Sequence, residues 1–175
     1  KKLIDLNVTR LKDEDIKWAD YVFISAMSIQ LASAQEIIAQ CVELGKKIVA
    51  GGPLFTEEYD QFPEIDHLVL NEAEITLPHF ISDLIRGEPK KIYKSDNFAD
   101  IAKSPLPDYS LLESGKYATA GIQYSRGCPF DCEFCDITAL FGRKVRTKTS
   151  DQIIAELDQL LQIKWNGSVF FVDDN

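Results

Sequence analysis

The segment Ala120-Gly-Ile-Gln-Tyr124-Ser-Arg-Gly-Cys128-Pro-Phe-Asp-Cys132-Glu-Phe-Cys135 joins a short apolar run to a loop that carries three cysteines. Residues 120–124 predict a strand, and residues 168–172 predict a second one. Between them, Thr149 and Gln152 form a capping box, followed by a helix whose apolar side chains recur at helical spacing. A single β–loop–α–β unit cannot bury its own sheet, so we expect this domain to continue beyond the chain.

The three cysteines lie within eight residues and have the spacing Cys-x-x-x-Cys-x-x-Cys. Thiolates hold iron–sulfur clusters, and short spacings let one loop reach several corners of a cube. Three ligands leave one iron of a four-iron, four-sulfur cluster open to another molecule. Gly127 and Pro129 suit a loop that turns tightly around such a cluster. We therefore predict that Cys128, Cys132 and Cys135 are its ligands.

Other uses of these cysteines remain open at this point. A structural zinc site requires four ligands, often in two Cys-x-x-Cys pairs, and only Cys132 and Cys135 have that spacing. A ferredoxin-like electron carrier would need a fourth cysteine nearby. The fourth, Cys41, lies far upstream on the apolar face of a predicted helix, where we expect it to be buried in the core.

The composition is that of an ordinary globular protein, with 45% hydrophobic and 27% charged residues among 175. No stretch approaches the roughly 20 apolar residues that span a bilayer, so we expect no transmembrane segment. A formal net charge of -9 argues against a nucleic-acid partner, which requires a basic surface. Clustered cysteines without a visible signal peptide favour a metal site in a reducing compartment, for which the cytoplasm is the default.

The first 88 residues alternate apolar runs with helical patterns, which predicts an α/β domain with a doubly wound, Rossmann-like parallel sheet. Ser33 and Glu36 predict a capping box for a first helix, and a second helix is expected from Leu77 to Arg86 with Pro78 in its first turn. Such sheets usually have five or six strands, so we expect the first strand and helix to be missing. The predicted strands span residues 2–6, 21–25, 47–51 and 67–70.

Residues 89–117 break both patterns. Pro105 and Pro107 favour an extended chain, and several Asp and Asn residues suppress regular structure. We interpret this stretch as a linker between a domain of residues 1–88 and a domain of residues 118–175. Further on, residues 143–148 carry four cations before the predicted helix, and we assign them no role because most such runs are merely solvated.

The cysteine spacing at the end of the first strand of a βα unit resembles the radical S-adenosylmethionine superfamily. The resemblance implies that residues 118–175 begin a partial (β/α) barrel and that the amine and carboxylate of S-adenosylmethionine bind the open iron. Cluster reduction then cleaves this cofactor to a 5′-deoxyadenosyl radical. By the family pattern, Phe134 packs against the adenine or the cluster edge; ordinary core packing is the alternative. Asp173 and Asp174 would hold the amino end of the cofactor; an acidic strand end exposed to water is the alternative.

A doubly wound domain placed before this motif resembles the cobalamin-binding radical S-adenosylmethionine enzymes. The resemblance rests on residues 25–30, 51–53 and 71–74, which follow three predicted strands at the edge where open α/β sheets bind ligands. Glycines there let the backbone approach a large flat ring. The resemblance implies that cobalamin contacts come from Ser25, Gln30, Gly51, Gly52 and Glu72.

Other segments are similar to a branch of this family that includes hopanoid methylases, and residues 105–112 look like the family's interdomain segment. The motif Asp-x-His-x-x-Gly, by which another cobalamin family ligates cobalt, does not occur in this sequence and would follow the strand that we expect to be missing. We interpret His67 and His79 as structural. The branch-like segments are Cys135-Asp-Ile137, Gly142-Arg143, Arg146-Thr-Lys-Thr149 and Phe171-Val-Asp-Asp-Asn175.

These observations predict a radical S-adenosylmethionine enzyme that transfers a methyl group to an unactivated carbon. The alternatives are an enzyme of the same family that closes or rearranges rings, and a non-catalytic binding module stabilised by a cluster or by zinc. We expect a small-molecule substrate, for which a lipid-like molecule is one candidate, and a reductase, flavodoxin or ferredoxin as electron donor. Because the substrate site would lie beyond this chain, we expect residues 1–175 alone to be inactive.

Overall fold

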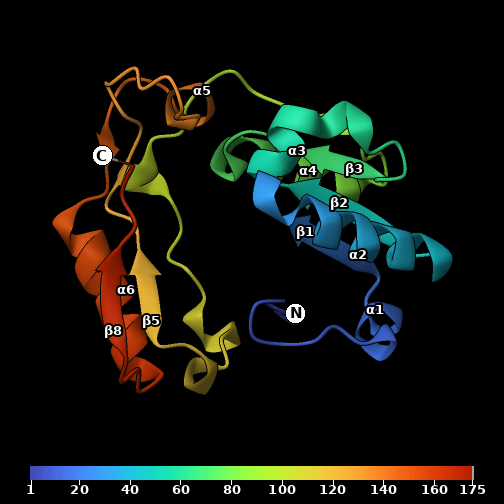
Figure 1. Ribbon diagram of the computed structural model, residues 1–175, viewed down its shortest axis with the longest axis horizontal. Helices are drawn as coiled ribbons and strands as arrows, with labels where there is room; N and C mark the ends of the chain where they lie inside the picture. The colour runs from blue at the N-terminus through green and yellow to red at the C-terminus, as the bar shows by residue number, and fades with distance from the viewer. Residues whose placement is uncertain (175) are drawn as a thin grey trace. The chain divides into compact units, whose positions relative to one another are not determined.

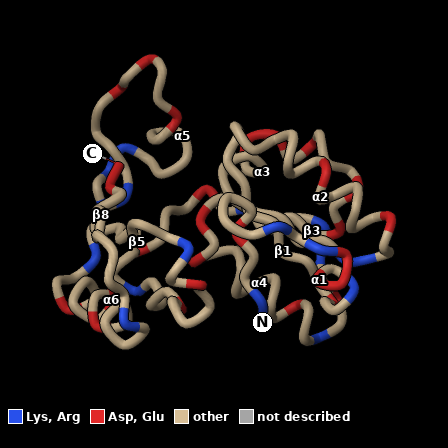
Figure 2. The backbone as a smooth tube through the Cα atoms, turned by 60° about the horizontal axis from the view of Figure 1, so that its bottom comes forward, with Lys and Arg blue, Asp and Glu red and all other residues tan. Residues whose placement is uncertain are grey.

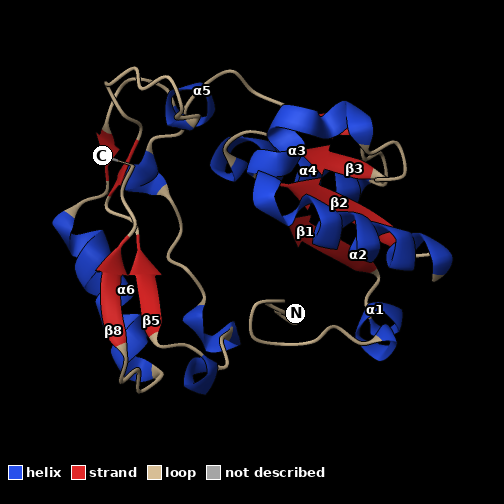
Figure 3. Cartoon of the chain, in the orientation of Figure 1, coloured by secondary structure: helices blue, strands red, loops and turns tan. Residues whose placement is uncertain are grey.

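A four-stranded parallel sheet organises residues 11–99, here called the sheet unit (Figures 1 and 3). The structure is a computed structural model that describes residues 1–174. The strands lie in the order β1-β2-β3-β4 and are parallel throughout. In chain order the helices and strands are α1 (Asp13–Trp18), β1 (Tyr21–Ser25), α2 (Leu31–Glu43), β2 (Lys47–Gly51), α3 (Pro53–Glu58), β3 (His67–Val69), α4 (Ala73–Arg86) and β4 (Ile92–Tyr93).

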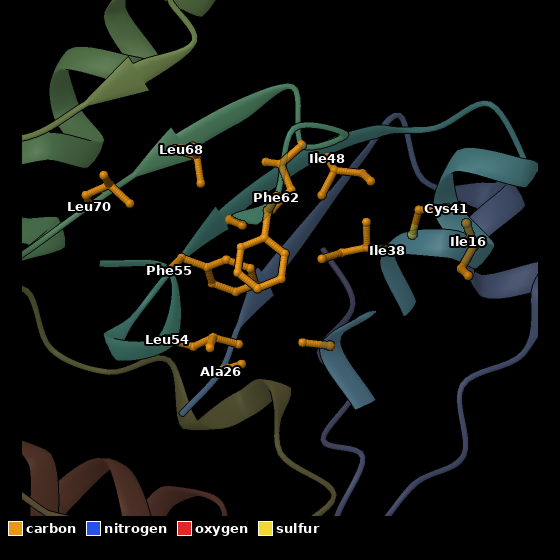
Figure 4. Close-up of a cluster of buried hydrophobic side chains, with 13 residues drawn as sticks. Ile16, Ala26, Ile38, Cys41, Ile48, Leu54, Phe55, Phe62, Leu68 and Leu70 are labelled. Atoms are coloured by element: carbon orange, nitrogen blue, oxygen red, sulfur yellow. The ribbon is translucent and has the colours of Figure 1, made fainter. Parts of the chain in front are cut away.

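The central strands β2 and β3 are buried on both faces, as their continuous apolar runs predict, whereas the edge strand β1 is only partly buried. Because side chains alternate along a strand, Ile48 and Ala50 of β2 face the core formed with α2 and α3, shown in Figure 4. Val49, between them, faces the opposite side and packs with Phe80 of α4. Helices therefore cover both faces of a parallel sheet, and the predicted α/β architecture of this unit is confirmed.

The strand predicted for residues 2–6 is wrong. These residues have no strand partner and belong with the other unit, where the chain turns at Asp5. The Asp5 carbonyl accepts hydrogen bonds from the amides of Val8 and Thr9, and its carboxylate accepts one from the Tyr117 hydroxyl at 3.0 Å. A short apolar run forms a strand only where a neighbouring strand can satisfy its backbone, and side-chain contacts hold this one instead.

Both helices predicted for the sheet unit begin earlier than expected. The helix α2 starts at Leu31, after a turn in which the Gln30 side-chain oxygen accepts a hydrogen bond from the Met27 amide at 2.8 Å, so Ser33 is not its cap. The helix α4 starts at Ala73, which places Pro78 inside the helix rather than in its first turn. Gly87 ends α4 as predicted.

The division of the structure falls between residues 99 and 100, and neither predicted linker boundary coincides with it. Residues 92–93 form β4 and pair with β3. The Tyr93 hydroxyl donates to Asp83 of α4 at 2.9 Å and accepts from the Lys90 amide at 2.7 Å. The first part of the predicted linker is therefore integral to the sheet unit, because aromatic side chains anchor segments that lack a periodic pattern.

Residues 1–10 and 100–174 form the second unit, here called the cysteine unit. Its centre is a pair of parallel strands, β5 and β8, joined through the helix α6 (Figures 1 and 3). Tyr109 and Leu160 are buried with Ala120 and Ile122 of β5. The capping box is confirmed, since the Gln152 amide donates to the Thr149 hydroxyl at 3.2 Å. The elements are β5 (Thr119–Ile122), β6 (Ser125–Arg126), α5 (Ile137–Phe141), β7 (Arg146–Thr147), α6 (Ser150–Gln162) and β8 (Ser168–Phe171).

Within residues 1–174, none of the helices has the length and apolar composition that crossing a membrane requires. Basic and acidic residues are interspersed along both units (Figure 2).

One ion pair joins neighbouring strands of the sheet unit. Asp66, just before β3, accepts hydrogen bonds from the Lys47 ammonium at 2.6 Å and the Ile48 amide at 2.9 Å. Partial burial, the largest single influence, raises the pKa of Asp66, but together these hydrogen bonds outweigh it and hold the pKa below its usual 3.8.

We expect Asp66 to make the sheet unit acid-sensitive. Because its folded pKa is lowered, its contribution is fully present above the unfolded value and is lost as pH falls through the folded one. Replacing Asp66 by Asn should lower the free energy of unfolding by about 1 kcal/mol at neutral pH, and the difference should shrink as the pH falls through the lowered folded pKa. Urea unfolding followed by Trp18 fluorescence in a Trp165→Phe background measures it in the sheet unit.

The matched control is Asp60→Asn, which removes an exposed carboxylate from the same unit. It should leave unfolding unchanged across the pH range. An Asp66→Asn effect that is equally large at both ends of the range would contradict the assignment.

Candidate functional site

The three loop cysteines lie in a long loop of the cysteine unit, and the two ends of this loop are paired in a short neck. The neck is the antiparallel pair β6 and β7, in which Ser125 faces Thr147 and Arg126 faces Arg146. The Lys148 amide extends it by donating to the Tyr124 carbonyl at 2.8 Å. Residues 127–145 between the two strands are called the cysteine loop. The sequence did not predict this neck, because a two-residue ladder has no detectable periodicity.

Gly127 closes the loop at its base. Its φ is +93°, and a Cβ atom there would lie 2.6 Å from the Lys144 carbonyl oxygen and 3.1 Å from that of Gly142. The next residue, Cys128, donates its amide to the same Gly142 carbonyl at 3.2 Å. Only glycine combines this backbone conformation with such close approach. The start and the end of the loop are therefore held together directly before the first cysteine.

All four cysteines are free thiols. Cys128 is buried, Cys135 is half-buried and Cys132 is exposed, and the Cys135 amide donates to the Cys132 carbonyl at 3.0 Å in a tight turn. Cys41 lies fully buried in the core of the sheet unit, as predicted, and burial raises the pKa of its thiol. The candidate donor set of the cysteine unit therefore consists of the three loop thiols.

A cluster and a single metal ion place their thiolate ligands differently. Among residues 1–174, no three His, Cys, Asp or Glu side chains are placed to share one metal ion. Zinc requires its donors to converge on one point. The thiolates of a four-iron cluster each bind a different iron, so they lie at separate corners. Three thiols on one loop are the number of protein ligands expected for a cluster that has one iron without a protein ligand.

The two carboxylates predicted to hold the cofactor contact the backbone that leads into the cysteine loop. Asp173 accepts hydrogen bonds through Oδ1 from the amides of Tyr124 at 2.7 Å and Ser125 at 2.8 Å. Asp174 accepts one through Oδ2 from the Gly127 amide at 2.8 Å. Both residues are thus brought next to the loop, and their predicted contact with the cofactor stays a prediction. Asn175, the last residue of that motif, lies outside the described part of the chain.

Phe134 is 89% exposed, so ordinary core packing does not explain it. Its predicted contact with an adenine ring or a cluster edge stays a prediction. Across the loop, Arg143 pairs with Asp131 at 2.5 Å, both largely exposed. The Arg126 guanidinium lies over the Phe141 ring, 5.4 Å from its centroid.

The basic run before α6 has structural roles that the sequence did not reveal. Arg146 donates to the Phe141 carbonyl at 2.7 Å, which ties the neck to α5. Lys148 pairs with Glu156 of α6 at 2.5 Å, and both side chains are buried. Glu156 lies among the apolar positions of α6, and an acidic residue on a buried helix face is a signal that it needs a cationic partner.

In the sheet unit, the predicted cobalamin contacts divide into two groups. Ser25, Gly51 and Gly52 meet where β1 and β2 end side by side. Added Cβ atoms would lie 2.6 Å from the Val69 carbonyl at Gly51, and 2.8 Å from the Ser25 hydroxyl at Gly52. The protein's own packing therefore explains both glycines.

The other two predicted contacts already have partners within the unit. Gln30 binds the Met27 amide. Glu72 is 3% exposed, and its carboxylate accepts the Ala99 amide. His67 hydrogen-bonds the Lys90 carbonyl at 2.7 Å, and His79 is an exposed residue of α4. Contact of Gln30 and Glu72 with cobalamin stays a prediction.

We expect Gly127→Ala to open the base of the cysteine loop, because its Cβ would collide with the Lys144 carbonyl in a strained backbone conformation. The free energy of unfolding should fall by about 1–3 kcal/mol, and amide hydrogen exchange of residues 125–128 should accelerate. The control Gly115→Ala adds a Cβ where nothing lies within 4 Å and should change neither quantity. Equal behaviour of the two variants would contradict this account.

We expect Lys148→Met or Glu156→Leu alone to destabilise the cysteine unit by about 3–5 kcal/mol, because each leaves a buried charge without its partner. The double variant should recover most of that loss, since apolar side chains of similar size then fill the site. Thermal unfolding of the four proteins gives the coupling. Additive effects of the two single variants would show that the pair does not interact.

No family model matches this sequence. The chain is 44% identical over 99% of its length to a protein of Synechocystis sp. described as an uncharacterised methyltransferase, and covers 33% of it. It is 36% identical over 99% of its length to hopanoid C-2 methylase of Rhodopseudomonas palustris, and covers 34% of that protein. The chain thus spans about a third of the length of the curated relatives it matches.

Among solved structures, the chain is similar to the radical S-adenosylmethionine methyltransferase TsrM of Kitasatospora setae. The TM-score is 0.66 over 92% of this chain and 38% of that one, with 14% identity. At this identity the likeness shows the fold alone. The structural likeness therefore shows a shared fold, and the sequence similarity over nearly the whole chain relates this chain to part of proteins described as methyltransferases or methylases.

Proposed function

We propose that this chain is the cofactor-binding part of a methyltransferase that uses radical S-adenosylmethionine chemistry. The observation that carries the proposal is the set of three free thiols on a loop whose base is closed by Gly127 and the neck. Its support from relatives is the similarity to hopanoid C-2 methylase over 99% of the chain. We propose a methyl transfer to an unactivated carbon of a small, lipid-like molecule.

In this proposal Cys128, Cys132 and Cys135 hold a four-iron, four-sulfur cluster. When bound, the cluster supplies an electron to S-adenosylmethionine at its open iron. The chain's own part is to present the thiols and to bind and orient the cofactor. The exposed ring of Phe134 is free to pack against an adenine. An external reductase, flavodoxin or ferredoxin would supply the electron, and free thiols fit a reducing compartment such as the cytoplasm.

Cobalamin is the proposed methyl donor, bound at the carboxyl edge of the sheet unit. A solved form of TsrM contains cobalamin and a [4Fe–4S] cluster. At this edge the last residue of β1, Ser25, exposes its hydroxyl, and the turn that follows exposes the apolar side chains of Met27 and Ile29. Such a surface suits a large flat ring with an amide rim. The residues proposed to lie near it are Ser25, Gln30, Gly51, Gly52 and Glu72. The two glycines and Glu72 act through the backbone that they shape.

The ligand set is tested in the full-length protein, purified without oxygen and reconstituted with iron and sulfide. We expect about four irons per chain, and a loss of most of this iron in Cys128→Ala, Cys132→Ala and Cys135→Ala. The matched control Cys41→Ala removes a buried cysteine outside the loop and should retain the iron. Elemental analysis and absorption spectra give the readout. One zinc and no iron in the native protein would overturn the cluster assignment.

The reaction class is tested by supplying S-adenosylmethionine with a labelled methyl group and following label and deoxyadenosine. We expect both to depend on cobalamin and on an electron donor, and we expect residues 1–175 alone to give neither. Formation of deoxyadenosine without any need for cobalamin would remove the support for methyl transfer and favour ring closure or rearrangement.

A further inference from the structure

Two successive carboxylates at the end of β8 accept the backbone N–H groups that lead into the cysteine loop. Up to Val172, whose amide donates to the Ile122 carbonyl at 2.9 Å, β8 and β5 are joined by an ordinary parallel ladder. Beyond this point the side chains of Asp173 and Asp174 replace the strand backbone as acceptors. They bind the amides of residues 124, 125 and 127 at 2.7, 2.8 and 2.8 Å.

These hydrogen bonds hold the backbone directly before Cys128. Gly127 precedes Cys128 directly, and its Cα is enclosed by carbonyl oxygens from the returning end of the loop. Asp174 holds the N–H of the same residue. Asp173 holds the N–H groups of Tyr124 and Ser125, where the chain enters the neck. Hydrogen bonds to an ionised carboxylate are stronger than those to a neutral acceptor, so the segment 124–127 is fixed on both sides.

We propose that Asp173 and Asp174 are positioning residues that act through the backbone of residues 124–127, and that they set the geometry in which Cys128 meets the cluster. This inference rests on the proposed cluster function. It differs from a direct grip on the amino end of S-adenosylmethionine, in which the charge of each carboxylate would face the cofactor. The oxygen atoms described above face the loop backbone instead.

The two roles respond differently to removal of charge and removal of the acceptor. Both bonds of Asp173 end on Oδ1, and an Asn side chain retains one oxygen that can accept them. Asp173→Asn therefore keeps the hydrogen bonds to the backbone amides but loses the charge, whereas Asp173→Ala loses both. The same pair of variants is made at Asp174. The control is Asp158→Ala, which removes an exposed carboxylate of α6 in the same unit.

The first readout is amide hydrogen exchange of residues 124–128 in the full-length protein before cluster reconstitution. We expect Asp173→Ala and Asp174→Ala to accelerate exchange there by about tenfold, while the Asn variants and Asp158→Ala stay near the native rate. Exchange of residues 124–128 at the native rate in both Ala variants would overturn the proposal that these carboxylates hold the backbone. This readout needs no cluster, so it remains decisive even if the native protein fails to bind iron, which is a failure of the proposed function alone.

The second readout is the cluster itself. We expect the Ala variants to lose iron to a chelator about 10–100-fold faster than the native protein and to show an altered electron paramagnetic resonance signal of the reduced cluster. The Asn variants should restore both. If Asp173→Asn retains iron and the native signal but binds S-adenosylmethionine as poorly as Asp173→Ala does, the carboxylate charge contacts the cofactor directly and the positioning role is overturned.

Discussion

The enclosure of Gly127 is the constraint on which the candidate site depends. The cysteine loop, of nearly twenty residues, contains one short helix, α5, which follows the three thiols, so the position of the thiols depends on where the two ends of the loop meet. Carbonyl oxygens from residues 141, 142 and 144 surround the Gly127 Cα, and its N–H is bound by Asp174. The first cysteine follows immediately and is buried, while the later two are more exposed.

Charged side chains from distant parts of the chain support this base. Lys148 and Glu156 connect the end of the neck to α6 through a buried ion pair. A pair of this kind contributes little net stability compared with apolar packing, but it strongly disfavours arrangements in which one charge is left alone. The same logic applies to Asp173, whose partners are backbone amides rather than a cation. The scaffold of the loop is thus polar, whereas the core beneath it is apolar.

The sheet unit shows how one sequence feature can have two explanations. Gly51 and Gly52 stand at the edge of an open α/β sheet where such sheets bind ligands and where we propose that cobalamin binds. The structure also gives each glycine a reason that involves no ligand, because the Val69 carbonyl and the Ser25 hydroxyl occupy the space of a side chain. The exposed loop after β1 is therefore the stronger structural argument for a ligand at this edge.

The sequence by itself predicted the ligand set, because Cys-x-x-x-Cys-x-x-Cys is a local pattern, and the assignment stays a prediction. It also determined the strands β1 to β3, of which β2 and β3 are buried, and the capped start of α6, since periodicity and caps act within a few residues. It misplaced residues 2–6, the start of α2 and the linker, where a neighbouring backbone or a single aromatic anchor decides the conformation. Only the tertiary structure decided that Asp173 and Asp174 bind amides 47 to 49 positions earlier in the chain. Backbone N–H groups are the same at every residue, so no sequence pattern identifies which of them a distant carboxylate will meet.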